Sequence, residues 1–462
     1  MAQNSPSKID TPNSFLNNDV ANMSGSTRKS NEEIKKYPKY WFVYHFGFFS
    51  FSMVYSLMTI NLPVFLIQGL HIDWISSSIV YIIPFIPTLL RPLFARNVDR
   101  ILSIIPSQLN IGVLFVIGGC IAIFASFWIV LGGLGALILI IIGLTLAVVG
   151  VNLINVAVDS HVLKVIPFEM SAKVNSNRKI ATFLGVLFCQ VFYLVIVNVK
   201  FTDFAAWNVY FMVSLIVIIG GYFLCVAINH SWCLCSEESE TLQFKMLKEI
   251  VGTPGSSLKF PRIQIMLLFA ISFCFAIPDG LTEMTFENYI IEFFGDLWWI
   301  VYSIFLIFSG AMMVIGYVIA RRVKKGIPEK WLLWAVPFNL VYFAILFLIP
   351  SGLGINAFLV VLVLTIVLFI FNGFIQVILF QFWQKNALRW RPALLFQLFF
   401  LGYQIGKLLG ILLSGHIMNQ AGQAGYPSIF ILTMILWCIA FACNLAFVIW
   451  NRSKKETLLN NR

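Results

Sequence analysis

Four carboxylates follow one apolar stretch of the sequence at helical spacing. They are, in chain order, Asp279, Glu283, Glu287 and Glu292, and they come directly after the apolar residues 263–276. On a helix the first three share one face, at about 0°, 40° and 80°, whereas Glu292 lies off it at about 220°. A charge in hydrocarbon is costly, so such a carboxylate is expected to face a partner or a wet cavity.

Depth separates these four acids. If hydrocarbon begins near Ile265, Asp279 lies ~21 Å inside it and Glu283 ~27 Å inside it, at 1.5 Å per residue. Asp279 is then past the midplane and Glu283 near the far boundary. The spacing predicts Glu287 and Glu292 in or near water, so only Asp279 and Glu283 need an intramembrane role.

The segment Pro278-Asp279-Gly280 predicts an interruption of this helix. Proline removes a backbone donor and glycine loosens the chain, and discontinuous helices are common at transporter substrate sites. The alternative is a structural kink whose carboxylate caps its own broken turn.

One lysine lies at a matching depth. Lys407 is in "LGYQIGKLLGILL", about 20 Å from the cytoplasmic end if its helix begins near Leu394. We expect it to pair with Asp279, with Glu283 as the second choice, at a site that binds cargo or exchanges a proton. A purely structural ion pair is the alternative.

Other polar residues inside apolar runs extend this candidate site. Asn152, Asn155 and Asp159 form one stripe, which suits either helix–helix contact or ligand binding. The complete predicted substrate and coupling-ion site consists of Asp279, Glu283, Lys407, Tyr403, Gln404, Asn372, Gln376, His45 and Asn155. No metal spacing and no nucleophile–base pair occurs among the five scattered histidines, so neither a metal, a cofactor nor an enzyme is expected.

Composition places these residues in a membrane. The 462 residues are 60% hydrophobic and 11% charged, which predicts repeated spans of about 20 apolar residues. The net charge of +11 resides largely in short loops, a pattern of membrane topology rather than of nucleic-acid binding. Residues 1–39 are polar, without an apolar signal region, and are expected to form a disordered cytoplasmic tail.

Apolar runs predict twelve transmembrane helices, so the fold class is all-α. They lie near 41–68, 74–95, 109–131, 135–162, 179–199, 207–228, 263–292, 297–320, 331–350, 355–381, 394–418 and 427–450. Basic residues collect in alternate connections, which predicts both termini on the cytoplasmic side. There we expect a gate formed by Arg96, Asp99, Arg100, Asp159, Arg178, Arg321 and Arg322.

A long polar connection divides the helices into two sets of six. The predicted domains are the bundle 40–228, the cytoplasmic loop 229–262, the bundle 263–451 and the cytoplasmic tail 452–462. The second and eighth helices both end in Ala-Arg-x-Val followed by charge, which indicates a repeat. This layout resembles the major facilitator superfamily, with two pseudo-symmetric six-helix bundles.

Several motifs resemble a narrower branch of that superfamily. "IPFIPTLLRPLFARNVDR", "VAVDSHVLKVIPFE" and "IPDGLTEMTFENYI" are similar to segments of muropeptide permeases and acetyl-coenzyme A transporters. Arg91 stands where that branch usually has lysine, and Arg96 near its second proline. The resemblance implies a transporter and does not specify its cargo.

The predicted function is therefore secondary active transport of a small polar or anionic solute by alternating access, with protons as a candidate coupling ion. A membrane-embedded transferase and a receptor or scaffold remain alternatives. The expected partners are the solute and membrane lipids, with no nucleic acid, and the expected form is a monomer in the cell membrane.

Overall fold

The computed structural model is a bundle of long helices. It describes residues 49, 52–57, 61–100, 104–129, 134–165, 168–197, 206–207, 209–211, 213–214, 216–221, 262–283, 285–294, 298–322, 328–348, 355–387 and 392–460. The predicted tail 1–39, His45 and nearly all of the loop 229–262 lie outside the described residues.

The first half of the chain contains eight described elements with defined bounds. They are α2 (Leu62–Val64) with η2 (Phe65–Gly69), α3 (Trp74–Ile82) with η3 (Ile83–Leu90) and α4 (Arg91–Arg100), α5 (Ile104–Ile129), α6 (Leu134–Val165) and α7 (Phe168–Ile196). Pro84 and Pro87 lie in η3, where the second predicted span tightens into a 3₁₀-helix between two α-helical parts.

The second half is described more completely. It consists of α9 (Arg262–Glu283), α10 (Phe286–Phe294), α11 (Trp298–Ala320), α12 (Pro328–Leu348), α13 (Ile355–Ala387), α14 (Pro392–Ala421), η6 (Gly422–Ala424) and α15 (Gly425–Asn460). Prolines open α12 and α14, where a missing backbone donor costs no helical hydrogen bond.

Eight helical stretches of the described residues are long and apolar enough to cross a membrane. One of them, Ala393–Trp450, has 58 residues and contains both α14 and α15. At 1.5 Å per residue this is about 87 Å, whereas hydrocarbon is about 30 Å thick. The chain turns at η6, where Gly422 has a φ of 54°, a conformation open to glycine. The chain is therefore a multi-pass integral membrane protein.

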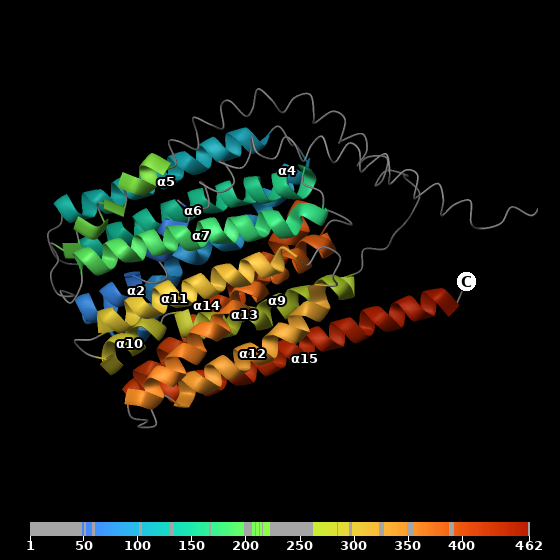
Figure 1. Cartoon of the computed structure of the whole chain (residues 1–462). Coiled ribbons are helices and arrows are strands. Elements are labelled where there is room, and N and C mark those ends of the chain that lie inside the picture. Colours follow the sequence, from blue (N-terminus) through green and yellow to red (C-terminus); the bar gives the residue numbers. More distant parts are fainter. Residues whose placement is uncertain are drawn as a thin grey trace, which may run out of the picture.

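Helices pack mainly with others from their own half of the chain. α5 lies along α6 in the first half, and α9 lies along α14 in the second (Figure 1). The halves meet where α14 crosses α3 and α4 and where α7 meets α11 and α13. Large apolar side chains on the outer surface, such as Val195 and Trp334, each 74% exposed, suit contact with lipid.

Several predicted helix boundaries are wrong. α7 begins at Phe168, not near residue 179, because its charged first turns bury Val174, Asn175 and Arg178 against the bundle. The seventh predicted span is two helices, and its break lies between Glu283 and Phe286, not at Pro278, which is inside α9. The terminal helix α15 also continues through most of the predicted tail.

Gly280 has a packing role instead of a helix-breaking one. A Cβ atom there would collide with the backbone carbonyl of Lys407, so only glycine allows α9 and α14 to approach this closely. At the end of the bundle opposite α4, Asp73 caps α3 by accepting a hydrogen bond of 3.0 Å from the Ser76 amide. That backbone hydrogen bond holds the pKa of the Asp73 carboxyl below its usual value.

Candidate functional site

An ion pair between Lys407 and Glu283 lies at the centre of the bundle. The Nζ atom of Lys407 is 2.5 Å from Oε2 of Glu283, and the two side chains are 5% and 13% exposed. Lys407 is in the middle of α14 and Glu283 is the last residue of α9. A buried ion pair stabilises a protein only if further hydrogen bonds satisfy its remaining donors and acceptors.

Two tyrosines from the first half complete this pair. The hydroxyls of Tyr55 and Tyr81 each donate to Oε1 of Glu283 at 3.2 Å. Lys407 donates to the Tyr55 hydroxyl, and its Nζ lies 4.4 Å from the centroid of the Tyr55 ring. These four residues, Tyr55, Tyr81, Glu283 and Lys407, are called the central cluster, and they join the two halves of the chain.

Asp279 belongs to a second set of contacts, one helical turn from Glu283. Its Oδ2 accepts a hydrogen bond from the hydroxyl of Tyr403. Lys179 interacts electrostatically with Asp279, and its Nζ lies 4.7 Å from the centroid of the Phe380 ring. The structure thus pairs Lys407 with the second-choice partner, Glu283. The close approach of α9 and α14 at Gly280 brings Lys407 near both acids, and the hydrogen bonds from Tyr55 and Tyr81 orient Glu283 toward it.

Sequence reasoning missed Lys179. The misplaced start of α7 put this lysine at the edge of a span, whereas the structure places it within the apolar stretch Ala172–Ile196. The buried positions Ala172, Asn175 and Ser176 recur at helical spacing before it, but two of the three are polar, so no apolar periodicity in the sequence marked this part of the helix.

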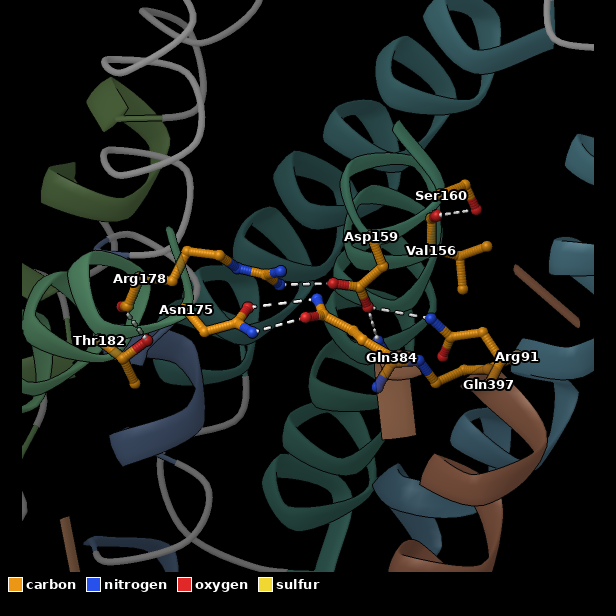
Figure 2. A network of polar contacts seen from close by, with 9 residues as sticks. All are labelled: Arg91, Val156, Asp159, Ser160, Asn175, Arg178, Thr182, Gln384 and Gln397. Carbon is orange, nitrogen blue, oxygen red and sulfur yellow. Dashed lines mark hydrogen bonds and ion pairs between the residues drawn. The ribbon is translucent and has the colours of Figure 1, made fainter. Parts of the chain in front are cut away.

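A second buried carboxylate, Asp159, joins the halves at the end of the bundle where α4 ends (Figure 2). Its Oδ1 is 2.5 Å from Nη2 of Arg178, and its Oδ2 is 3.6 Å from Nη2 of Arg91. Gln397 of α14 donates to the same Oδ2 at 2.9 Å. We call Arg91, Asp159, Arg178 and Gln397 the Asp159 network.

Further contacts close the same end, which we call the basic end because Arg96, Arg322 and Lys385 also lie there. Asn175 and Gln384 exchange amide hydrogen bonds of 2.8 and 3.4 Å between α7 and α13. The guanidinium of Arg91 lies 3.9 Å from the centroid of the Phe400 ring. Arg321 donates to Ser176 at 2.8 Å and to Asn177 at 2.5 Å, which connects α11 to α7.

Polar contacts also join the halves at the opposite end. Gln190 donates to Asn61 at 3.0 Å and accepts from the Tyr302 hydroxyl at 3.3 Å. Gln68 of η2 donates to Asn288 of α10 at 3.3 Å. The structure is therefore held together at both ends, with the central cluster between them.

The other predicted site residues lie outside the central cluster. Asn155 and Gln404 are buried, and Gln376 donates to Asn372 at 3.2 Å while accepting from Tyr317 at 3.3 Å.

The predicted gate residues are only partly brought together. Asp159 contacts Arg178, one of the partners considered, whereas Arg96 and Arg322 are exposed. The side chains of Asp99 and Arg100 lie outside the described residues. Arg91 and Gln397, which the prediction omitted, occupy the places next to Asp159.

Glu287 corrects the depth argument. It is only 4% exposed, although the spacing placed it in or near water. The break before α10 and the tyrosines of α7 and α11 enclose it, and the depth estimate took neither into account. Within the described part of the chain, no group of three His, Cys, Asp or Glu residues has the geometry to hold a metal ion.

Comparisons with known proteins find similar solved structures but no matching sequence family. No family model matches this chain, and no curated protein matches it. A bacterial homologue of the iron transporter ferroportin, in an outward-facing state, aligns with a TM-score of 0.60 and 13% identity over 89% of this chain and 99% of that one.

Two further solved transporters align similarly. The peptide transporter POT in complex with alafosfalin has a TM-score of 0.59 and 15% identity, covering 87% of this chain and 94% of its own. The major facilitator superfamily transporter FucP, in the outward conformation, has a TM-score of 0.56 and 14% identity, covering 87% and 97%. The chain therefore has the fold of the major facilitator superfamily transporters.

Proposed function

We propose that this chain is a secondary transporter that moves a small polar or anionic solute across a membrane by alternating access. The observation that carries the proposal is the central cluster: a buried ion pair of the second half is completed by two tyrosines of the first. A contact of this kind breaks when the halves separate, so the cluster would couple the binding of cargo to movement. The fold it shares with solved transporters supports the same reading.

The cargo site would lie between the central cluster and Asp279. Lys407 and Lys179 supply two cationic groups for an anionic solute, and Tyr403 and Gln404 supply hydrogen bonds. Cargo that competes for Lys407 would release Glu283, which is the step we assign to coupling. A proton is the candidate coupling ion, because a released carboxylate within a span can take one up.

The Asp159 network would be the gate on the cytoplasmic side. In this proposal both termini and the connection 229–262 are cytoplasmic, the bundles are 40–228 and 263–451, and the protein acts as a monomer in the cell membrane. The motif resemblance favours the branch of muropeptide permeases and acetyl-coenzyme A transporters.

The experiment is a flux assay in proteoliposomes. A panel of labelled anionic and neutral polar solutes is first screened by thermal stability, because a ligand of the folded state raises the melting temperature. Each solute that binds is then tested for counterflow, with Lys407→Gln as the inactive control. Binding without flux in the wild type, under every imposed gradient of protons and sodium, would contradict the proposal and favour a receptor.

A further inference from the structure

A buried carboxylate outside the central cluster forms no ion pair and no hydrogen bond of ordinary geometry with the described residues. Glu287 is 4% exposed, and neither of its carboxyl oxygens accepts a hydrogen bond from the described residues. No described basic side chain forms an ion pair with it, and the protein almost completely excludes it from solvent. Burying a carboxylate that has no compensating partner is energetically costly.

Aromatic side chains from both halves surround this carboxyl group. The hydroxyls of Tyr193, Tyr210 and Tyr302 all interact electrostatically with Glu287. The hydroxyl of Tyr193 is close to the carboxyl without completing a hydrogen bond of ordinary geometry.

The rings of these tyrosines pack together with Trp298. The ring centroid of Tyr193 lies 5.7 Å from that of Tyr210 and 6.2 Å from that of Trp298. The ring centroids of Trp298 and Tyr302 are 6.1 Å apart. We call Glu287, Tyr193, Tyr210, Tyr302 and Trp298 the aromatic box.

The box lies where the halves meet, at the end opposite the basic end. Tyr193 belongs to α7 of the first half, whereas Glu287 and Tyr302 belong to α10 and α11 of the second. Tyr302 also donates to Gln190, which binds Asn61. Separation of the halves at this end would therefore expose the aromatic box on the side of the membrane opposite the basic end.

An organic ammonium group suits both the carboxyl and the ring faces of the aromatic box. A carboxylate attracts a cation, and electron-rich ring faces attract an organic ammonium group. A hard metal ion instead requires several oxygen ligands, and rings cannot supply them. Glu287 is in the first turn of α10, where the helix dipole offsets part of the cost of burying its charge, and a bound cation would offset more of it.

We propose that the aromatic box, with Glu287 as its anion, binds the ammonium group of an organic cation, as one part of the cargo or as a second solute. This inference deepens the proposed function. Only the role of the site in transport rests on that function, because ammonium binding can be measured without flux. Cargo with both an anionic and an ammonium group would reach from Lys179 or Lys407 to Glu287.

The test measures binding to the full-length protein in nanodiscs. Choline chloride and propylammonium chloride are titrated at constant ionic strength and pH, with sodium chloride as the reference salt, and the melting temperature is recorded. We expect a saturable rise for at least one ammonium probe and none for sodium. In Glu287→Gln the concentration for half of this rise should increase roughly tenfold to a hundredfold, as expected for a lost charge-assisted contact.

The matched control is Glu292→Gln, on the same helix. Glu292 is half-buried and interacts with Tyr426 and Gln423 outside the box, so its replacement should leave the ammonium titration unchanged. Equal loss in both variants would overturn the proposal. So would a wild-type protein stabilised by sodium or by acidification alone and indifferent to both ammonium probes.

A second pair of variants keeps the test decisive if Glu287→Gln does not fold. The Tyr193 hydroxyl accepts and donates no hydrogen bond among the described residues, so Tyr193→Phe should preserve ammonium binding. Tyr193→Leu removes the ring and should weaken it several-fold. Equal affinity in these two variants would show that the ring face is not used and would overturn the aromatic part of the site. Flux that fails while ammonium binding persists would refute only the proposed function.

Discussion

Asp159 and Glu283 are both buried carboxylates that connect the two halves, yet they are compensated in different ways. Asp159 contacts two guanidinium groups and a glutamine amide. Glu283 contacts one ammonium group and two tyrosine hydroxyls. Guanidinium groups are always charged and fix a planar geometry, whereas lysine is a mobile point charge and tyrosine a neutral donor.

This difference indicates two kinds of work. The Asp159 network suits a contact that forms or breaks as a unit, because its cations cannot be neutralised. The central cluster suits exchange, because a solute anion can replace Glu283 at Lys407 and the tyrosines can hydrogen-bond to either. The predictions below separate these roles, beginning with the largest expected effect.

The largest effect should come from removing one member of the central ion pair. Lys407→Gln or Glu283→Gln leaves an unpaired buried charge and should destabilise the protein by about 3–5 kcal/mol if the pair is dry. The double variant should restore most of this stability, measured by denaturation in detergent, while flux in proteoliposomes stays lost. Recovered flux in the double variant would show that the pair is only structural.

A smaller loss is expected at the basic end. Asp159→Asn removes the carboxylate that Gln397 of the second half binds, and it leaves Arg91 and Arg178 of the first half without their shared partner. Because Arg91 also packs on Phe400 of the second half, the contact between the halves should weaken by about 2 kcal/mol or more. The expected result is greater accessibility of the bundle interior from this end, measured by labelling a cysteine introduced on α7, with solute binding retained.

Unchanged labelling would rule out a gate. The control is Thr182→Val, because the Thr182 hydroxyl donates to the Arg178 carbonyl within α7 and not to the other half.

Gly280→Ala tests whether the approach of α9 to α14 positions Lys407. The added Cβ would meet the Lys407 carbonyl, and overpacking of this kind costs about 1–3 kcal/mol. Solute affinity should fall along with stability, because Lys407 moves relative to Glu283. Gly118→Ala, where a Cβ meets nothing within 4 Å, should leave both measurements unchanged.

The smallest effect should come from a single tyrosine hydroxyl. Tyr81→Phe removes one of two hydrogen bonds to Glu283 and should cost about 1 kcal/mol. If the central cluster serves exchange, the variant should also change the pH dependence of flux, because Glu283 loses a donor. A loss of stability with an unchanged pH profile would assign Tyr81 to packing alone.

Much of the architecture was predictable from local pattern. Spans of apolar residues bounded by charge, proline and glycine predicted the order of the described helices, because a membrane requires each crossing to be apolar and internally hydrogen-bonded. The same reasoning placed Lys407 and the α9 acids together, since a lysine within a span requires a partner. Helix ends were less certain: α7 starts in a charged segment whose polar residues are buried by other helices, which no local pattern reveals.

The amino-acid sequence by itself determined that charges would be buried in a helical membrane bundle and which acids share a face. Only the tertiary structure decided which partners they contact. The rotation of the helices and their close approach at Gly280 allow Lys407 to pair with Glu283. Tyrosines from distant parts of the chain enclose Glu283 and Glu287. These choices depend on contacts between residues about 100 to 350 positions apart, so periodicity along one helix carries no information about them.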